Sequence, residues 1–288
     1  MIFNPSFPYR FAHMVAAAYL TTAFIVAGIG AWYILRERSV PHGRIMLGMG
    51  LSILVWLAPL QLVIGDMHGL NTREHQPAKV AAIEAHWETQ KGAPLILFAL
   101  PDPKTESNHY EIAIPKLGSL ILAHDWDAEI RGLKSFPKDE RPNPIIPFFA
   151  FRIMVGIGLI MIAVGITGAI LWLTGRLFTT RWFLHVLTYV SPLGFLAVLA
   201  GWFTTEVGRQ PWTVYGVLRT ADSVSPVSGG SVLTSLILFV IVYAIVFGAG
   251  VYYIAQLVKR GPDLTPPDVP EEGEGDPSRR PMEAAGNP

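Results

Sequence analysis

Four side chains that can bind iron or carry protons lie within or beside apolar stretches of the chain: His13, Arg152, Met154 and Glu206. A charged group inside a membrane costs about 3 kcal/mol, so it is a functional candidate by default. Imidazole and thioether together form a ligand pair of six-coordinate, low-spin haem. His13 and Met154 are therefore candidate iron ligands. The residues alone also allow a histidine bonded to a neighbouring helix and a methionine that only fills space.

The two charged candidates each have more than one interpretation. Arg152 and Met154 are two residues apart, so they do not share a helix face. Arg152 can pair with a haem propionate or a quinol oxygen, or it can extend to the membrane surface. Glu206 lies beside Arg209 in the stretch GWFTTEVGRQPW. It can ligate a metal, relay protons, or form an ordinary ion pair at a membrane boundary, where tryptophans are common.

A second group of candidates lies in a long polar stretch. Residues 79–88 have a helical pattern, and Pro77 stands at the expected helix start. Lys79 and Glu84 are five positions apart, about 140° around a helix, so they are not a simple ion pair. Oxidation of a quinol needs a proton acceptor near its hydroxyl, and Glu84 or Asp66 is suitable. The alternative interpretation is a solvated surface helix without catalytic residues.

The elements that must position these residues are membrane-spanning helices. The chain is 51% hydrophobic and only 15% charged, which is typical of membrane proteins. A span needs about 20 apolar residues. Five segments are long enough, and they predict an all-α, polytopic membrane helix bundle with five transmembrane helices. These segments are Phe11–Leu35, Ile45–Ile64, Phe148–Leu173, Trp182–Phe203 and Val232–Val258.

The basic residues predict how the bundle is oriented. Lys and Arg are concentrated in residues 36–44, in residues 175–181 and at 259–260. Short basic loops stay in the cytoplasm, so we expect the N-terminus outside and the C-terminus in the cytoplasm. The expected regions are two spans (1–65), an external, partly folded loop (66–144), three spans (145–260) and a disordered cytoplasmic tail (261–288).

Composition excludes several classes of site and leaves others as alternatives. The chain has no cysteine, which excludes disulfides, iron–sulfur clusters and thiolate metal sites. Its formal net charge is zero, so nothing indicates nucleic-acid binding. A transporter would show broken helices in matching halves, and the prolines within spans, Pro59 and Pro192, do not lie in corresponding halves. A membrane anchor for a redox partner would need neither Lys79 nor Glu84.

Several strings, in this order, resemble subunit I of the cytochrome bd quinol oxidases: FAHMVAAAYL, GDMHG, KVAAIEAHWETQ, FFAFRIMVG and GWFTTEVGRQPW. Among them, FRIMVG and GRQPW are the most specific. The string IPKLGSLILAHDWD is similar to the cyanide-insensitive branch, which has a short quinol-oxidation loop (Q-loop). The resemblance extends from about Phe7 to Arg260.

The resemblance implies roles for the intramembrane residues. His13 and Met154 match the two ligands of the low-spin haem b, and Arg152 matches the arginine beside that haem. Glu206 matches the glutamate associated with the high-spin haem b. Arg209 matches a neighbouring arginine, which is expected to bind the cofactor.

The resemblance also implies roles in and near the loop. Trp212, at the end of the last string, is a further expected cofactor-binding residue. Lys79 and Glu84 match the pair in the periplasmic Q-loop that is implicated in quinol oxidation. Asp66 matches an acidic position at the start of that loop. Residues 66–144 are therefore expected to be the quinol-oxidation loop.

For the whole oxidase, the resemblance implies quinol:oxygen oxidoreductase activity in the bacterial cytoplasmic (inner) membrane. It also implies haem d or a third haem b, subunit II and a small single-span subunit. Members of the family have about four more helices before the position of His13, and these carry the histidine that ligates haem d. The chain therefore resembles the C-terminal part of subunit I: a gene fragment, half of a split subunit, or a chain with a wrongly assigned start. A non-catalytic truncated fragment is the alternative.

Overall fold

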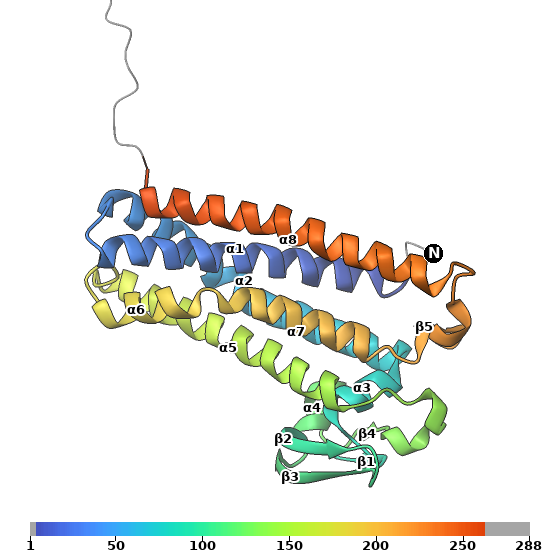
Figure 1. Ribbon diagram of the computed structural model, residues 1–288. Coiled ribbons are helices and arrows are strands. Elements are labelled where there is room, and N and C mark those ends of the chain that lie inside the picture. The colour runs from blue at the N-terminus through green and yellow to red at the C-terminus, as the bar shows by residue number, and fades with distance from the viewer. Residues whose placement is uncertain (1–3, 263–288) are drawn as a thin grey trace, which may run out of the picture. The chain divides into compact units, whose positions relative to one another are not determined.

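The protein is described by a computed structural model, which covers residues 4–262 (Figure 1). It divides into two compact units, Met1–Val240 and Ile241–Pro288, which we describe separately. Five helical stretches are long and apolar enough to cross a membrane, which confirms the predicted helix bundle. They are α1 (Phe7–Leu35), α2 (Val40–His75), α5 (Ile145–Leu173), α6 with α7 (Arg181–Val190 and Leu193–Val207) and α8 (Gly229–Arg260).

Two spans differ from the predicted ones. The fourth is divided into α6 and α7 at Pro192, because proline lacks the N–H that would continue the helical hydrogen bonds. Helix α2 continues past Ile64 to His75. Its 36 residues correspond to about 54 Å at 1.5 Å per residue, well beyond a hydrocarbon core of about 30 Å. Asp66 therefore lies in a helix rather than in the loop predicted to begin there.

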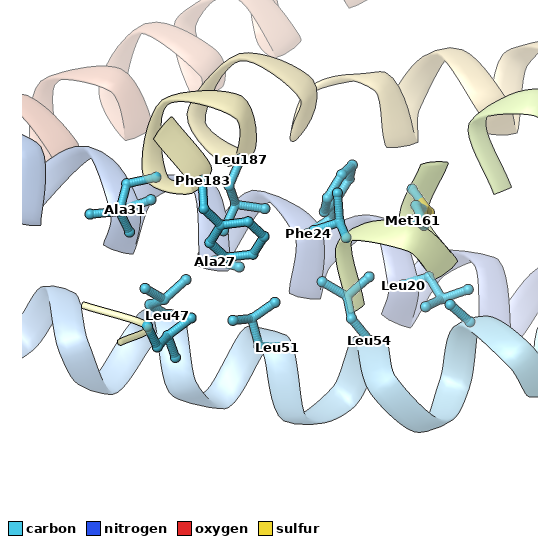
Figure 2. Packing of buried hydrophobic residues seen from close by; sticks show 14 of the residues in the cluster. Leu20, Phe24, Ala27, Ala31, Leu47, Leu51, Leu54, Met161, Phe183 and Leu187 are labelled. Carbon is cyan, nitrogen blue, oxygen red and sulfur yellow. The ribbon is translucent and has the colours of Figure 1, made fainter. Parts of the chain in front are cut away.

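The core of the bundle is formed by α1, α2, α5 and α6. Figure 2 shows leucines of α2 pointing toward aromatic and small side chains of α1 and α6. The labelled members of this buried cluster are Leu20, Phe24, Ala27, Ala31, Leu47, Leu51, Leu54, Met161, Phe183 and Leu187. This packing fixes α1, α2 and α5 against one another; α1 carries His13, and α5 carries Met154 and Arg152.

The region between α2 and α5 is folded. Its helices are α3 (Pro77–Glu84) and α4 (Leu117–Ala123), and its strands are β1 (Gln90–Lys91), β2 (Leu95–Asp102), β3 (Ser107–Ile114) and β4 (Glu129–Ile130). Strands β2 and β3 form an antiparallel hairpin, and β1 pairs with β4. Two short 3-10 helices, η1 (Leu133–Ser135) and η2 (Lys138–Glu140), precede α5. Helix α3 begins at Pro77 as predicted, and it ends at Glu84 because Ala85 is left-handed, with φ 54°.

A short β ribbon follows α7. Strands β5 (Trp212–Val214) and β6 (Leu218–Arg219) pair in antiparallel fashion, and η3 (Thr220–Ser223) leads toward α8. The predicted disordered tail, residues 261–288, lies outside the described residues from position 263 onward.

Candidate functional site

His13 is positioned by helix α2. Its ring lies so close to Gly65 that a Cβ at that glycine would be 3.3 Å from the imidazole Cε1. The Gln61 amide nitrogen is 3.3 Å from each ring nitrogen and donates a hydrogen bond to the His13 carbonyl oxygen at 3.0 Å. The ring of His68 lies 5.6 Å away, measured between ring centroids. Sequence reasoning missed Gln61 and His68, although both lie on the helix face that carries Gly65.

Met154 is positioned by the contact between α5 and α7. A Cβ at Gly201 would lie 2.9 Å from the Met154 sulfur. A side chain at this position would force the thioether to shift. Met154 and Arg152 contact different elements, α7 in one case and α3 with β2 in the other, as expected for two residues that are two positions apart.

His13 and Met154 lie at about the same depth of the bundle. A Cβ at Gly194 of α7 would be 3.1 Å from Thr21 of α1 and 3.2 Å from Met161 of α5, so these three residues mark one level. His13 lies eight residues (21 minus 13) from that level, and Met154 lies seven (161 minus 154). At 1.5 Å per residue these distances are about 12 and 10 Å, both toward the Q-loop end. An imidazole and a thioether on different helices at one depth fit the ligand set of a low-spin haem.

A cationic cluster surrounds Glu206 at the Q-loop end of α7. The Arg209 guanidinium hydrogen-bonds the Glu206 carboxylate. The Lys79 side chain is buried, and its stem lies over Gly208. The pKa of Lys79 is lowered to about 8, mainly by burial and then by the positive charges of Arg10 and Arg209, while Glu206 opposes the shift. The cluster thus contains three basic side chains and one carboxylate.

Two buried donors of this cluster have no acceptor. In the described part of the chain, the Nε atoms of Arg10 and Arg209 are buried without a hydrogen-bond partner. Buried donors are nearly always paired, so the cluster suits an additional anion with carboxylate oxygens. The propionates of a haem have this chemistry. Arg10 was missed by sequence reasoning, although it lies three residues before His13 and hence on a nearby face of the helix.

Arg152 connects three elements. Its guanidinium donates to the carbonyls of Ile83 at 2.8 Å, Phe148 at 3.1 Å and Ile96, and it forms an ion pair with Glu84 at 3.1 Å. The guanidinium carbon also lies 3.5 Å from the centroid of the Phe148 ring. Helices α3 and α5 and strand β2 are therefore joined at one side chain.

The two candidate quinol residues on α3 are buried and face different partners. Lys79 is 5% exposed and Glu84 is 3% exposed, so the solvated-surface interpretation of this helix is wrong. Glu84 pairs with Arg152, whereas Lys79 lies near the cluster around Glu206. They do not pair with each other, as their spacing predicts. Helix α3 thus lies between the two groups of candidate residues.

The remaining two predicted residues lie apart from this pair. Asp66 is part-exposed and accepts a hydrogen bond at 3.0 Å from Nε2 of His124, the residue that follows α4. Among the described contacts, none joins Asp66 to Lys79 or Glu84. Trp212 lies in β5, where its ring packs against Tyr215 and Arg219.

Fold and site together define a class: a polytopic membrane helix bundle with a histidine and a methionine near one end, and a folded loop that contributes buried acidic and basic residues. Comparison with known proteins is more specific. The family model described as cytochrome bd terminal oxidase subunit I matches residues 1–262, and the chain belongs to this family.

Individual relatives agree with the family assignment. The chain is 34% identical over 275 residues to cytochrome bd ubiquinol oxidase subunit 1 of Bacillus subtilis, covering 91% of this chain and 58% of that protein. It is 28% identical over 343 residues to cytochrome bd-II ubiquinol oxidase subunit 1 of Escherichia coli, covering 96% and 66%. The bd oxidase structure from Geobacillus thermodenitrificans matches with a TM-score of 0.80 and 33% identity, covering 91% and 60%. The chain thus spans about three fifths of the length of these relatives.

Proposed function

We propose that this chain is the quinol-oxidising, haem b-binding part of subunit I of a cytochrome bd-type oxidase, with its Q-loop on the periplasmic face of the cytoplasmic membrane. The observation that carries the proposal is the position of helix α3. It buries Glu84 against Arg152 and Lys79 beside the cluster around Glu206. The residues expected to handle quinol therefore lie next to those expected to hold haem.

The haem ligands follow from the donor types. His13 and Met154 would hold the low-spin haem b, and Glu206 would hold the high-spin haem b. Haem, when bound, supplies one-electron transfer. The basic cluster would neutralise propionate charges, with the unpaired Nε atoms of Arg10 and Arg209 as donors.

Glu84 is the proposed proton acceptor. Arg152 holds its carboxylate in place, and a carboxylate can accept the proton of a quinol hydroxyl. The Lys79 ammonium can donate a hydrogen bond to the quinol oxygen. The proton then leaves on the loop side. Asp66, part-exposed on α2, is a candidate for the next acceptor.

Oxygen reduction to water is assigned to the complete oxidase. Haem d or a third haem b would serve there, together with subunit II and a small single-span subunit. In the family, the histidine for that haem lies in helices that precede the position of His13. This chain would supply electrons to that haem.

The ligand assignment is tested with the chain purified together with its partner subunits. Reduced-minus-oxidised spectra are recorded for the wild type, Met154→Leu and Met161→Leu. Met161 is a matched control, because it is a buried methionine on the same helix, seven residues from Met154. We expect Met154→Leu to abolish the low-spin b-type signal and Met161→Leu to retain it. A low-spin signal that survives in Met154→Leu, or a purified wild type without haem, would contradict the proposal.

A further inference from the structure

The β2–β3 hairpin has apolar side chains on both faces. One face is buried and includes Ile96, Ala99 and Ala113, which pack in a cluster with Phe148. The other face, which we call the outer hairpin face, consists of Phe98, Leu100, Tyr110, Ile112 and Ile114, whose exposed fractions run from 42% to 80%. An antiparallel hairpin in water normally presents polar residues on its exposed face. Contiguous exposed apolar groups of this kind mark a contact surface.

The register shows which of these side chains share a face. Phe98 is directly opposite Ile112 in the hairpin, and opposite residues point to the same side. Ile112 and Ile114 occupy alternate positions along β3, with Glu111 before them on the opposite side. The pairing shifts between Phe98 and Leu100, so that Leu100 is opposite His109. The outer hairpin face is therefore apolar from Phe98 to Ile114, with the titratable His109 at the end near the turn.

The depth of the hairpin is set by helix α5. The hairpin lies beside the first turns of this helix, close to α3 and α4 (Figure 1). The rings of Phe98 and Phe149 are 6.2 Å apart, and Arg152 bonds the Ile96 carbonyl. Helix α5 is apolar enough to cross a membrane from Ile145 onward. The hairpin is thus level with roughly the first 10 Å of a membrane-spanning helix.

The apolar surface continues from α5 onto the hairpin. Ile146 and Ile153 of α5 are 51% and 45% exposed, and they flank the turns on which the hairpin packs. The hairpin cannot enter the hydrocarbon core, because a two-stranded sheet has unpaired edge groups that hydrocarbon does not satisfy. Its turn is also polar, with Asp102, Lys104 and Glu106. An exposed tyrosine such as Tyr110 is typical of the boundary between headgroups and acyl chains.

We propose that the outer hairpin face rests in the headgroup–acyl boundary of the leaflet on the Q-loop side and fastens the loop to the membrane. The occupant is phospholipid rather than a partner protein, because the face is mainly apolar and continues the lipid-level surface of α5. A hairpin held at the membrane also holds strand β2, which supplies a carbonyl to Arg152, the partner of Glu84. Lipid contact is independent of the assigned quinol chemistry.

The absence of cysteine in this chain allows single-site spin labelling. Ile112→Cys, Lys104→Cys and Ile166→Cys are each labelled with a nitroxide in the oxidase complex, with cysteine-free partner subunits, in phospholipid nanodiscs. Lys104 lies in the polar turn and serves as the aqueous reference. Ile166, on α5, serves as the hydrocarbon reference. Collisions with oxygen, which is enriched in lipid, and with a water-soluble nickel chelate are compared by electron paramagnetic resonance.

We expect the label at 112 to collide severalfold more often with oxygen than with the nickel chelate. The label at 104 should show the reverse preference. The label at 112 should also lie at a shallower depth in the membrane than the label at 166. A label at 112 that behaves like the one at 104 would show a hairpin in water. Protection from both reagents would show a protein partner. Either of these two results overturns the proposal, and an unchanged haem spectrum in Ile112→Cys establishes that the variant is folded.

Discussion

At the scale of single residues, Arg152 links several elements around the candidate site. It is partly buried, donates to carbonyls of three elements and forms an ion pair with Glu84. The planar guanidinium can do this because it presents five donors in a fixed arrangement, which lysine lacks. The buried Glu84 carboxylate thus has a charged partner that holds it in place.

This role of Glu84 leads to a kinetic prediction. Glu84→Gln keeps the shape of the side chain but removes its basicity, so quinol oxidation should fall about 100-fold or more. The haem spectrum should be unchanged, because Glu84 is not a proposed ligand. The measurement is quinol oxidation by the purified oxidase complex.

Glu88 supplies a matched control for this measurement. It lies in the same loop, but it is exposed and pairs with Lys134. Glu88→Gln should therefore retain activity. Equal losses in the two variants would indicate a general effect on the loop instead of proton transfer by Glu84.

At the scale of elements, the α5–α7 contact should control the haem environment. A Cβ at Gly201 would lie 2.9 Å from the Met154 sulfur, closer than side chains normally approach. We expect Gly201→Ala to displace the thioether and to shift or weaken the low-spin signal in the reduced-minus-oxidised spectrum. Gly158→Ala is the control, because a Cβ there meets nothing within 4 Å in the described structure. An unaltered signal in Gly201→Ala would show that the sulfur is placed by something other than this contact.

The hairpin turn should loosen in acid. Glu106 pairs with Lys138 and Arg141, each at 3.1 Å, and the Lys138 hydrogen bond lowers its pKa below the ordinary 4.5. A carboxyl with a lowered folded-state pKa stabilises the fold above its unfolded-state pKa, and this contribution is lost as the pH falls through the folded-state value. Hydrogen exchange of the turn at residues 102–107 should therefore accelerate below about pH 4.5. Glu106→Gln should make that acceleration smaller, and an identical profile in the variant would contradict the assignment.

At the scale of the whole molecule, single cysteines on the two sides test the orientation in the membrane. The orientation predicted from basic residues puts the Q-loop outside and the short turn between α5 and α6 in the cytoplasm. In spheroplasts, Lys104→Cys should react with a membrane-impermeant thiol reagent. Arg176→Cys should react only after the membrane is opened. The opposite pattern would invert the orientation and place the quinol residues on the cytoplasmic side.

Sequence patterns predicted much of this molecule but not its loop. The five spans follow from apolar length alone, and the start of α3 follows from Pro77. The extension of α2 to His75 was missed because residues after Ile64 are polar, although they are compatible with helix. The β2–β3 hairpin was missed because β2, LILFALPD, is a continuous apolar run. It lacks the alternation that normally indicates a half-buried strand.

The sequence by itself determined the number of membrane-length helices, the types of side chain available for iron and proton chemistry, and the family resemblance. These are properties of local composition and short motifs. Tertiary structure alone decided which charges meet: Glu84 with Arg152, 68 residues away, and Lys79 with the cluster around Glu206. The physical reason is that apolar length acts along one helix, whereas the pairing of buried charges depends on how α3, α5 and α7 pack together.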